Sequence, residues 1–351
     1  MKIIHCADIH LGSKMKTNLN SEKAALRKAE IYDTFLNMIK YANNYDIKHI
    51  IIAGDLIDSK KGSISIVRKV LNTIKKNSEI TFYYVEGNHD NNIFNIDELP
   101  DNMKVFNDEF MLYDLGEVEI GSCKDVNRGY KSVNFNKDKF SILILHGNIV
   151  NYDSLGDEDI YLKNYINKNI NYIALGHIHK KETYKVDDLV ASYSGCLEGR
   201  GFDETGEKGF YVLDISEDKK LSQEFINVSK RALHEVEVNI DNVIDEYSLY
   251  DEIINSLKKY SKNDLYKIIL KGKYDLSLNK NLHYITQKLN EEYYFVKIED
   301  QSKVKINYKD YENDVSLMGE FIRTVINNKE LNEEDKDRII EYGVKALIDE
   351  L

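Results

Sequence analysis

The feature that most constrains the fold of this chain is a short apolar run followed within a few residues by histidine, aspartate or asparagine, which occurs five times in the first 180 residues. Short apolar runs bounded by turn-forming residues are typical of buried strands. In open α/β sheets, ligands bind outside the carboxyl ends of the strands. We therefore expect one site built from the segments that follow these runs: Asp8-Ile9-His10, Gly54-Asp55, Gly87-Asn88-His89, His146-Gly147 and Gly176-His177-Ile178-His179.

Strand-like and helix-like patterns alternate through the first 215 residues and predict an α/β fold. Helical periodicity covers residues 22–43 and 65–77, between apolar runs that predict buried strands. The predicted strands are 2–6, 49–53, 81–85, 141–145, 172–175 and 210–214.

The pattern changes after a mostly charged and polar stretch at 216–231. Strands are predicted at 235–240, 265–270 and 294–298, with helices at 247–260 and 282–289, and a helical hairpin follows from residue 318. We expect a catalytic domain at 1–225, a small α/β cap domain at 231–303 and C-terminal helices at 310–351. The amphipathic helices admit three interpretations: packing on their own domain, a homodimer contact, or docking on a partner protein.

Seven side chains with nitrogen or oxygen donors occupy the strand-end segments: Asp8, His10, Asp55, Asn88, His146, His177 and His179. A single residue of this kind is more often a helix cap or a structural histidine, but five segments in order indicate a metal site. Without thiolates, the set suits Mn²⁺, Fe²⁺ or Zn²⁺. Seven ligands fit two ions if one carboxylate bridges them, and two ions about 3.5–4 Å apart can hold the attacking and leaving oxygens of a phosphoryl transfer.

The five segments, in this order, resemble the calcineurin-like metallophosphoesterase superfamily. The resemblance implies a sandwich of two β-sheets flanked by helices. It assigns one metal ion to Asp8, His10, Asp55 and His179. It assigns the other ion to Asp55 (bridging), Asn88, His146 and His177. It makes His89 the catalytic residue that donates to the scissile phosphate or the leaving oxygen. Histidine suits this role because its side chain ordinarily has a pKa near the working pH.

Within the superfamily, residues 4–12 and 175–180 are similar to SbcD-type DNA-repair nucleases, and residues 197–209 resemble the YhaO-like bacterial branch. This resemblance implies an exonuclease or endonuclease acting on DNA with Mn²⁺, and an SbcC-like ATPase as partner of the C-terminal helices. The alternative is a metallophosphoesterase acting on cyclic nucleotides, small phosphoesters or phosphoproteins. A non-catalytic scaffold is a third hypothesis, which the complete set of ligand positions disfavours.

Two further residues are candidates for supporting roles. Asp58 stands three residues after Asp55, where some members of the family have a histidine. We interpret Asp58 as orienting His89 or another ligand, or alternatively as the start of a helix. Arg200 belongs to the glycine-rich segment (residues 195–209), which could bring its guanidinium onto a phosphate or could be a plain hairpin loop.

Charge and composition limit the remaining possibilities. The formal net charge of −12 disfavours nucleic-acid binding through a broad basic surface, although bound metal ions would attract phosphate locally. Three scattered cysteines are too few for a disulfide framework and indicate a reducing compartment. The sequence has neither a secretory apolar segment nor the roughly 20 apolar residues of a membrane helix. We expect a cytoplasmic protein without membrane contact.

Overall fold

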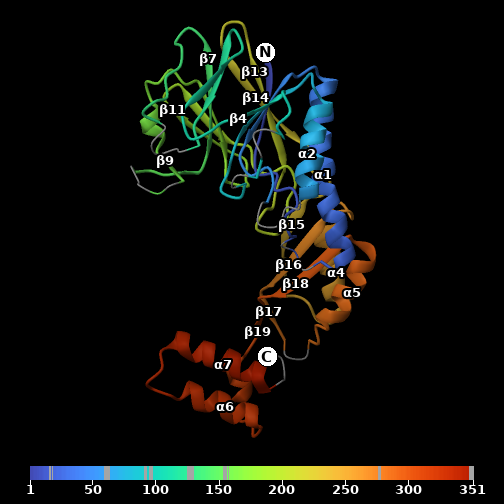
Figure 1. Ribbon diagram of the computed structural model, residues 1–351. Coiled ribbons are helices and arrows are strands. Elements are labelled where there is room, and N and C mark those ends of the chain that lie inside the picture. The colour runs from blue at the N-terminus through green and yellow to red at the C-terminus, as the bar shows by residue number, and fades with distance from the viewer. Residues whose placement is uncertain are drawn as a thin grey trace. The chain divides into compact units, whose positions relative to one another are not determined.

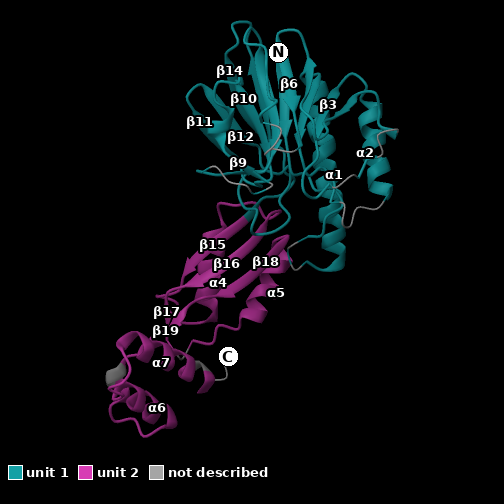
Figure 2. Cartoon of the chain, turned by 60° about the vertical axis from the view of Figure 1, so that its left-hand side comes forward, with its two compact units in different colours: residues 1–233 teal, residues 234–351 magenta. Residues whose placement is uncertain are grey.

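The computed structural model describes residues 1–347 except 16, 18, 59–63, 91–92, 95–97, 125–129, 153–155, 157 and 276–277. The chain divides into two compact units, residues 1–233 and 234–351, which Figure 2 colours separately. Each unit has its own hydrophobic core.

The first unit contains a six-stranded sheet in the order β14-β13-β1-β2-β3-β4. Strands β1 to β4 run parallel, and β13 pairs antiparallel with both β1 and β14. The bounds are β1 Lys2–Cys6, β2 His49–Ala53, β3 Thr81–Val85, β4 Met103–Val105, β13 Gly209–Ile215 and β14 Leu221–Asn227. The four strands predicted in this sheet agree with these bounds to within one residue.

A second six-stranded sheet has the order β11-β12-β10-β7-β6-β5. Its four central strands are parallel, and the edge strands β11 and β5 are antiparallel to their neighbours. The bounds are β5 Met111–Asp114, β6 Val118–Ser122, β7 Phe140–His146, β10 Tyr172–Gly176, β11 Glu182–Val186 and β12 Leu189–Tyr193. Near them lie the short pair β8 Asn148–Ile149 and β9 Asp159–Ile160, and the 3-10 helix η2 Leu162–Tyr165.

Alternation along the strands separates the cores on their two faces. In β1, Ile4 packs with helices α1 (Ser21–Asn44) and α2 (Ile64–Lys76), which cover one side of the first sheet in Figure 1, whereas Ile3 faces the second sheet. In β7, Ile144 belongs to the core between the sheets and Leu143 to the core on the outer face. The predicted sandwich of two sheets flanked by helices is confirmed.

Strand β14 lies inside the stretch 216–231 that the sequence presents as polar. Its residues alternate between exposed and partly buried, because an edge strand with one solvated face needs few apolar side chains. It pairs with β13 along its whole length and runs two residues past 225. The first unit continues to Leu233.

The second unit has a three-stranded sheet in the order β15-β16-β18, with β16 and β18 parallel. Its core joins the sheet to helices α4 and α5 through residues such as Val238, Ile253, Ile268 and Leu289. The bounds are β15 Leu233–Asn239, α4 Glu246–Leu257, β16 Leu265–Lys271, α5 Leu282–Glu292 and β18 Phe295–Asp300, with the short pair β17 Lys273–Tyr274 and β19 Lys303–Val304.

Two helices, α6 (Leu317–Ile326) and α7 (Glu333–Leu347), follow the 3-10 helix η3 (Tyr308–Tyr311). Asn332 caps the start of α7, since its side-chain oxygen accepts a hydrogen bond of 2.8 Å from the N–H of Asp335. Ile322 of α6 and Val344 of α7 are buried in the core of this unit. Residues 348–351 of the expected hairpin lie outside the described part of the chain. No described helix is long and apolar enough to cross a membrane.

Candidate metal centre

All five predicted segments lie at the carboxyl ends of parallel strands: β1, β2, β3, β7 and β10. The loops after β1 and β2 remain paired beyond the strands, since the N–H groups of Asp8 and His10 donate to the carbonyls of Gly54 and Asp55 over 3.1 and 2.8 Å. Asp8, His10 and Asp55 all have φ near +50°. Residues other than glycine seldom adopt this left-handed backbone, and such strain concentrates at functional sites.

Four of the predicted ligands form one cluster. Asp8, His10, Asp55 and His179 each offer a donor atom, and these atoms lie within 4.8 Å of one another. The Nε2 atom of His10 is 3.1 Å from Nε2 of His179 and 3.4 Å from Oδ2 of Asp55. Ligand atoms held about 2.1 Å from one ion lie roughly 3 Å apart. The cluster therefore has the spacing of a divalent-metal site.

One predicted ligand of the other ion, His146, also lies next to Asp55. Oδ2 of Asp55 is 3.6 Å from Nε2 of His146, and the rings of His146 and His177 meet edge to face with centroids 5.3 Å apart. The exposed Asn88 precedes His89, whose backbone N–H donates to Oδ1 of Asp55 over 2.9 Å. The Oδ2 atom of Asp55 is thus close to both His10 and His146, which the sequence analysis assigns to different ions.

The hydrogen bonds leave metal-ligating atoms unused. His146 donates from Nδ1 to the carbonyl of Ala53 over 2.9 Å, so its Nε2 carries the lone pair. That Nε2 atom and Oδ2 of Asp8 are buried without a hydrogen-bond partner. A buried polar atom without a partner is costly, and metal coordination is one way to satisfy it. The residues present therefore fit divalent ions.

The electrostatics of the cluster also favour a cation. Burial and the neighbouring Asp55 raise the pKa of Asp8 well above its usual value. Burial lowers the pKa of His10 and of His146, which keeps both imidazoles neutral, the form that binds metal. A divalent ion between Asp8 and Asp55 would relieve the repulsion of their carboxylates.

The comparison with known families agrees with this geometry. The family model described as calcineurin-like phosphoesterase matches residues 1–181, which include all seven predicted ligands. The chain belongs to the calcineurin-like phosphoesterase family. Membership makes it a metal-dependent phosphoesterase and accounts for the His/Asp cluster at the strand ends.

Three relatives are similar to this chain over most of its length. The DNA double-strand break repair protein Mre11 of Sulfolobus acidocaldarius is 28% identical over 75% of this chain and 72% of its own. The SbcD component of the nuclease SbcCD from Staphylococcus saprophyticus is 25% identical over 70% and 74%. The uncharacterized metallophosphoesterase YhaO of Bacillus subtilis is 23% identical over 78% and 72%. The resemblance to SbcD-type and YhaO-like proteins is confirmed.

His89 and Asp58 lie at the edge of the cluster. The ring of His89 is 4.9 Å from that of His10, and its Nδ1 is 4.0 Å from Oδ1 of Asp58. The side chain of His89 is partly exposed, which an acid that meets a substrate requires. Asp58 is close enough to His89 for an ion pair but too far for a hydrogen bond in this arrangement.

Arg200 lies behind the cluster instead of on an exposed surface. It is buried, and its Nη2 donates to Oε1 of Glu204 over 2.7 Å. The same Nη2 atom is 3.0 Å from Nδ1 of His179. The guanidinium predicted as a phosphate contact therefore sits next to a ligand candidate, with its charge balanced by Glu204.

Three supporting residues have no role in the sequence-based prediction. The carboxylate of Asp90 accepts hydrogen bonds from the N–H groups of Leu56, Ile57 and Gly87 and so joins the loops after β2 and β3. Glu204 is 2.9 Å from Nδ1 of His179, and Lys208 donates to the His179 carbonyl over 2.7 Å. Asp90 directly follows His89, and Glu204 and Lys208 lie in the glycine-rich segment. Their closeness in sequence to predicted site residues is the signal that could have identified them.

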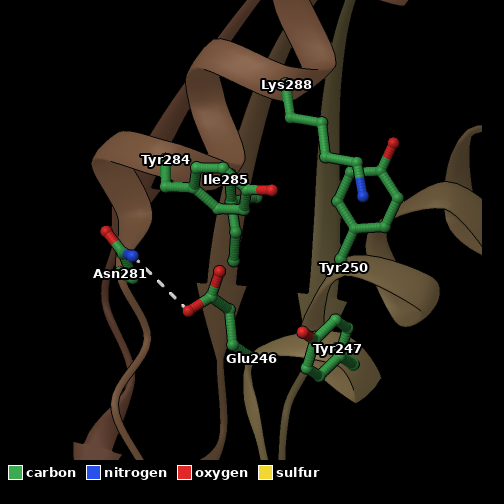
Figure 3. A pocket seen from close by; sticks show the side chains of 7 residues that line it. All are labelled: Glu246, Tyr247, Tyr250, Asn281, Tyr284, Ile285 and Lys288. Carbon is green, nitrogen blue, oxygen red and sulfur yellow. Dashed lines mark hydrogen bonds between the residues drawn. The ribbon is translucent and has the colours of Figure 1, made fainter.

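A separate hollow in the second unit has different chemistry. Figure 3 shows it between α4, which contributes Glu246, Tyr247 and Tyr250, and α5, which contributes Tyr284 and Lys288. The ammonium of Lys288 lies 3.9 Å from the centroid of the Tyr250 ring. Among the described residues that line this hollow there is one carboxylate and no histidine, so they lack the donor set of the strand-end cluster.

Proposed function

We propose that the chain is a DNA nuclease that hydrolyses phosphodiester bonds with two divalent ions, Mn²⁺ being the expected metal. The observation that carries the two-ion site is the position of Asp55, whose Oδ2 is 3.4 Å from Nε2 of His10 and 3.6 Å from Nε2 of His146. DNA as the substrate is supported by the relatives named as repair and SbcCD nucleases.

The two ions would share Asp55. Asp8, His10 and His179 would complete the ligands of the first ion, and Asn88, His146 and His177 those of the second. When bound, two such ions stabilise the charge that develops on a phosphodiester and lower the pKa of water. In a chain of net charge −12, they would also supply the positive charge that attracts phosphate.

The proton chemistry falls to this chain's own residues. His89, partly exposed beside His10, would donate a proton to the leaving oxygen. Asp58, whose Oδ1 is 4.0 Å from Nδ1 of His89, would help to orient that ring. In this proposal Asp58 stands where the family resemblance gives some members a histidine.

We further propose a cytoplasmic protein that works with an SbcC-like ATPase. The second unit would supply the cap domain (231–303) and the docking helices (310–351), and a homodimer contact is the rival use of these helices. Cys6, Cys123 and Cys196 are buried and form no disulfide with one another, an arrangement typical of proteins in a reducing compartment.

Digestion of end-labelled duplex DNA by the purified chain tests the proposal. We expect cleavage with Mn²⁺, no cleavage after EDTA treatment, and loss of both metal and activity in Asp55→Asn. His89→Ala should retain Mn²⁺ and lose turnover at least ~100-fold, the usual contribution of a general acid. Hydrolysis of an aryl phosphodiester without any cleavage of DNA would favour the small-phosphoester alternative, and full activity of His89→Ala would refute its role.

A further inference from the structure

The glycine-rich segment carries two buried carboxylates, each paired with an arginine. Glu204 binds Arg200 within the segment, and Glu198 binds Arg27 of α1 over 2.8 Å. Glu198 and Glu204 are 2% and 3% exposed. The two carboxylates have different further partners. Glu204 contacts the ligand candidate His179. Glu198 instead accepts hydrogen bonds from Thr34 and from the backbone N–H of Lys230.

The two ring nitrogens of His179 face different groups. Nε2 points to the cluster, 3.1 Å from Nε2 of His10, and Nδ1 is 2.9 Å from Oε1 of Glu204. A nitrogen that binds a metal must be unprotonated, so the neutral ring carries its proton on Nδ1 and donates it to Glu204. Arg200 cannot donate to the same protonated nitrogen, although its Nη2 lies 3.0 Å away.

Arg200 acts on Glu204 instead. Its Nε and Nη2 donate to Oε1 over 3.1 and 2.7 Å, and its backbone N–H donates to Oε2 over 2.7 Å. Burial alone would raise the pKa of Glu204, but the hydrogen bonds from His179 and Arg200 outweigh it and hold the pKa below its usual range. Lys208 fixes the backbone of His179 by donating to its carbonyl. One segment thus holds both the ring and the main chain of His179.

We propose that Glu204 is a positioning residue, which fixes the tautomer and ring orientation of His179 for the ion shared with Asp8 and His10 while Arg200 holds Glu204 in place. The inference rests on the proposed metal site and not on DNA as the substrate. His146, the histidine assigned to the other ion, donates from Nδ1 to the backbone carbonyl of Ala53. Loss of Glu204 should therefore weaken the binding of one ion and leave the binding of the other unchanged.

Calorimetric titration of Mn²⁺ into the metal-free full chain at pH 7.5 tests this asymmetry. We expect two binding events in the wild type, one of which weakens ~10–100-fold in Glu204→Gln. Glu198→Gln is the matched control, because it also removes a buried carboxylate from an arginine. It should lower thermal stability but leave both Mn²⁺ affinities unchanged. Glu204→Asp, which keeps the charge, should recover part of the lost affinity.

The possible outcomes separate this inference from the proposed function. If the wild type binds no Mn²⁺, the metal site and the inference both fail. If the wild type binds two ions and Glu204→Gln binds them equally well, or loses no more than Glu198→Gln, only the role of Glu204 is wrong. If Glu204→Gln does not fold, Arg200→Lys replaces it in the titration, because lysine keeps the charge but cannot make the forked contact. Unchanged binding in that variant would overturn the inference.

Discussion

His5, in the middle of β1, is fully hydrogen-bonded as a neutral imidazole. Its Nε2 can donate to the carbonyl of Leu175 over 3.2 Å, and its Nδ1 can accept from the hydroxyl of Tyr172 over 2.9 Å. Burial lowers the pKa of His5 from 6.5 to about 3. The residue that the sequence places in an apolar run is thus held uncharged in the core between the sheets.

This lowered pKa predicts an acid-sensitive fold. Because the unfolded chain binds the proton first, the stabilisation is fully present above pH 6.5 and falls as the pH drops toward 3. From pH 7 to pH 5 the loss from this one group should be about 2 kcal/mol. Urea unfolding in EDTA at both pH values should show a smaller loss for His5→Gln than for the wild type. Equal losses in the two proteins would contradict the prediction.

The loops at the carboxyl ends of β1, β2, β3, β7 and β10 could be predicted, because the apolar runs stop abruptly at Gly, Asp, Asn and His. The residues that form hydrogen bonds with these ligand candidates and their loops could not be predicted. Asp90 and Glu204 act through backbone N–H groups and ring nitrogens that approach only after folding, which residue types do not encode. Arg200 illustrates the limit: its charge suggested a phosphate, but the nearby Glu204 pairs with it.

The loop after β2 depends on a glycine. Gly54 has φ of +86°, and a Cβ at this position would lie 2.1 Å from Nδ1 of His146. Gly116, in the turn between β5 and β6, has φ of +91° and open space around its Cβ position. The two glycines therefore share a backbone conformation that favours glycine. Of the two, Gly54 is the one that lies against the ring of the ligand candidate His146.

Gly54→Ala should displace the ring of His146 and weaken Mn²⁺ binding at least ~10-fold, in addition to the backbone cost. Gly116→Ala should cost only the left-handed backbone strain, ~1–2 kcal/mol, and leave Mn²⁺ binding unchanged. Calorimetric titration and thermal unfolding of both variants measure the two effects separately. Equal Mn²⁺ affinity in the two variants would show that the contact with His146 is readily relieved.

Strand alternation and helical periodicity in the sequence predict the elements of the second unit. They do not predict which apolar side chains of its helices stay exposed to solvent. The structure buries Ile322 and Val344 in the core of this unit, which accounts for one face of the hairpin. Other apolar residues at the helices remain exposed: Val315 at 98%, Leu317 at 69% and Tyr342 at 61%. Leu317 begins α6 and Tyr342 lies on α7, so each helix offers an exposed apolar side chain to a partner.

If these helices dock on an SbcC-like ATPase, the double substitution Leu317→Glu with Tyr342→Glu should weaken capture of that ATPase at least ~10-fold, because two charges would be buried without partners at the contact. Hydrolysis of a small aryl phosphodiester should be unchanged, since the strand-end cluster lies in the first unit. Tyr247→Glu is the control, because Tyr247 is 80% exposed on α4 of the same unit. Co-purification of the paired proteins measures capture, and size-exclusion chromatography measures oligomeric state. Unaltered capture with a change from dimer to monomer would assign these helices to a homodimer contact instead.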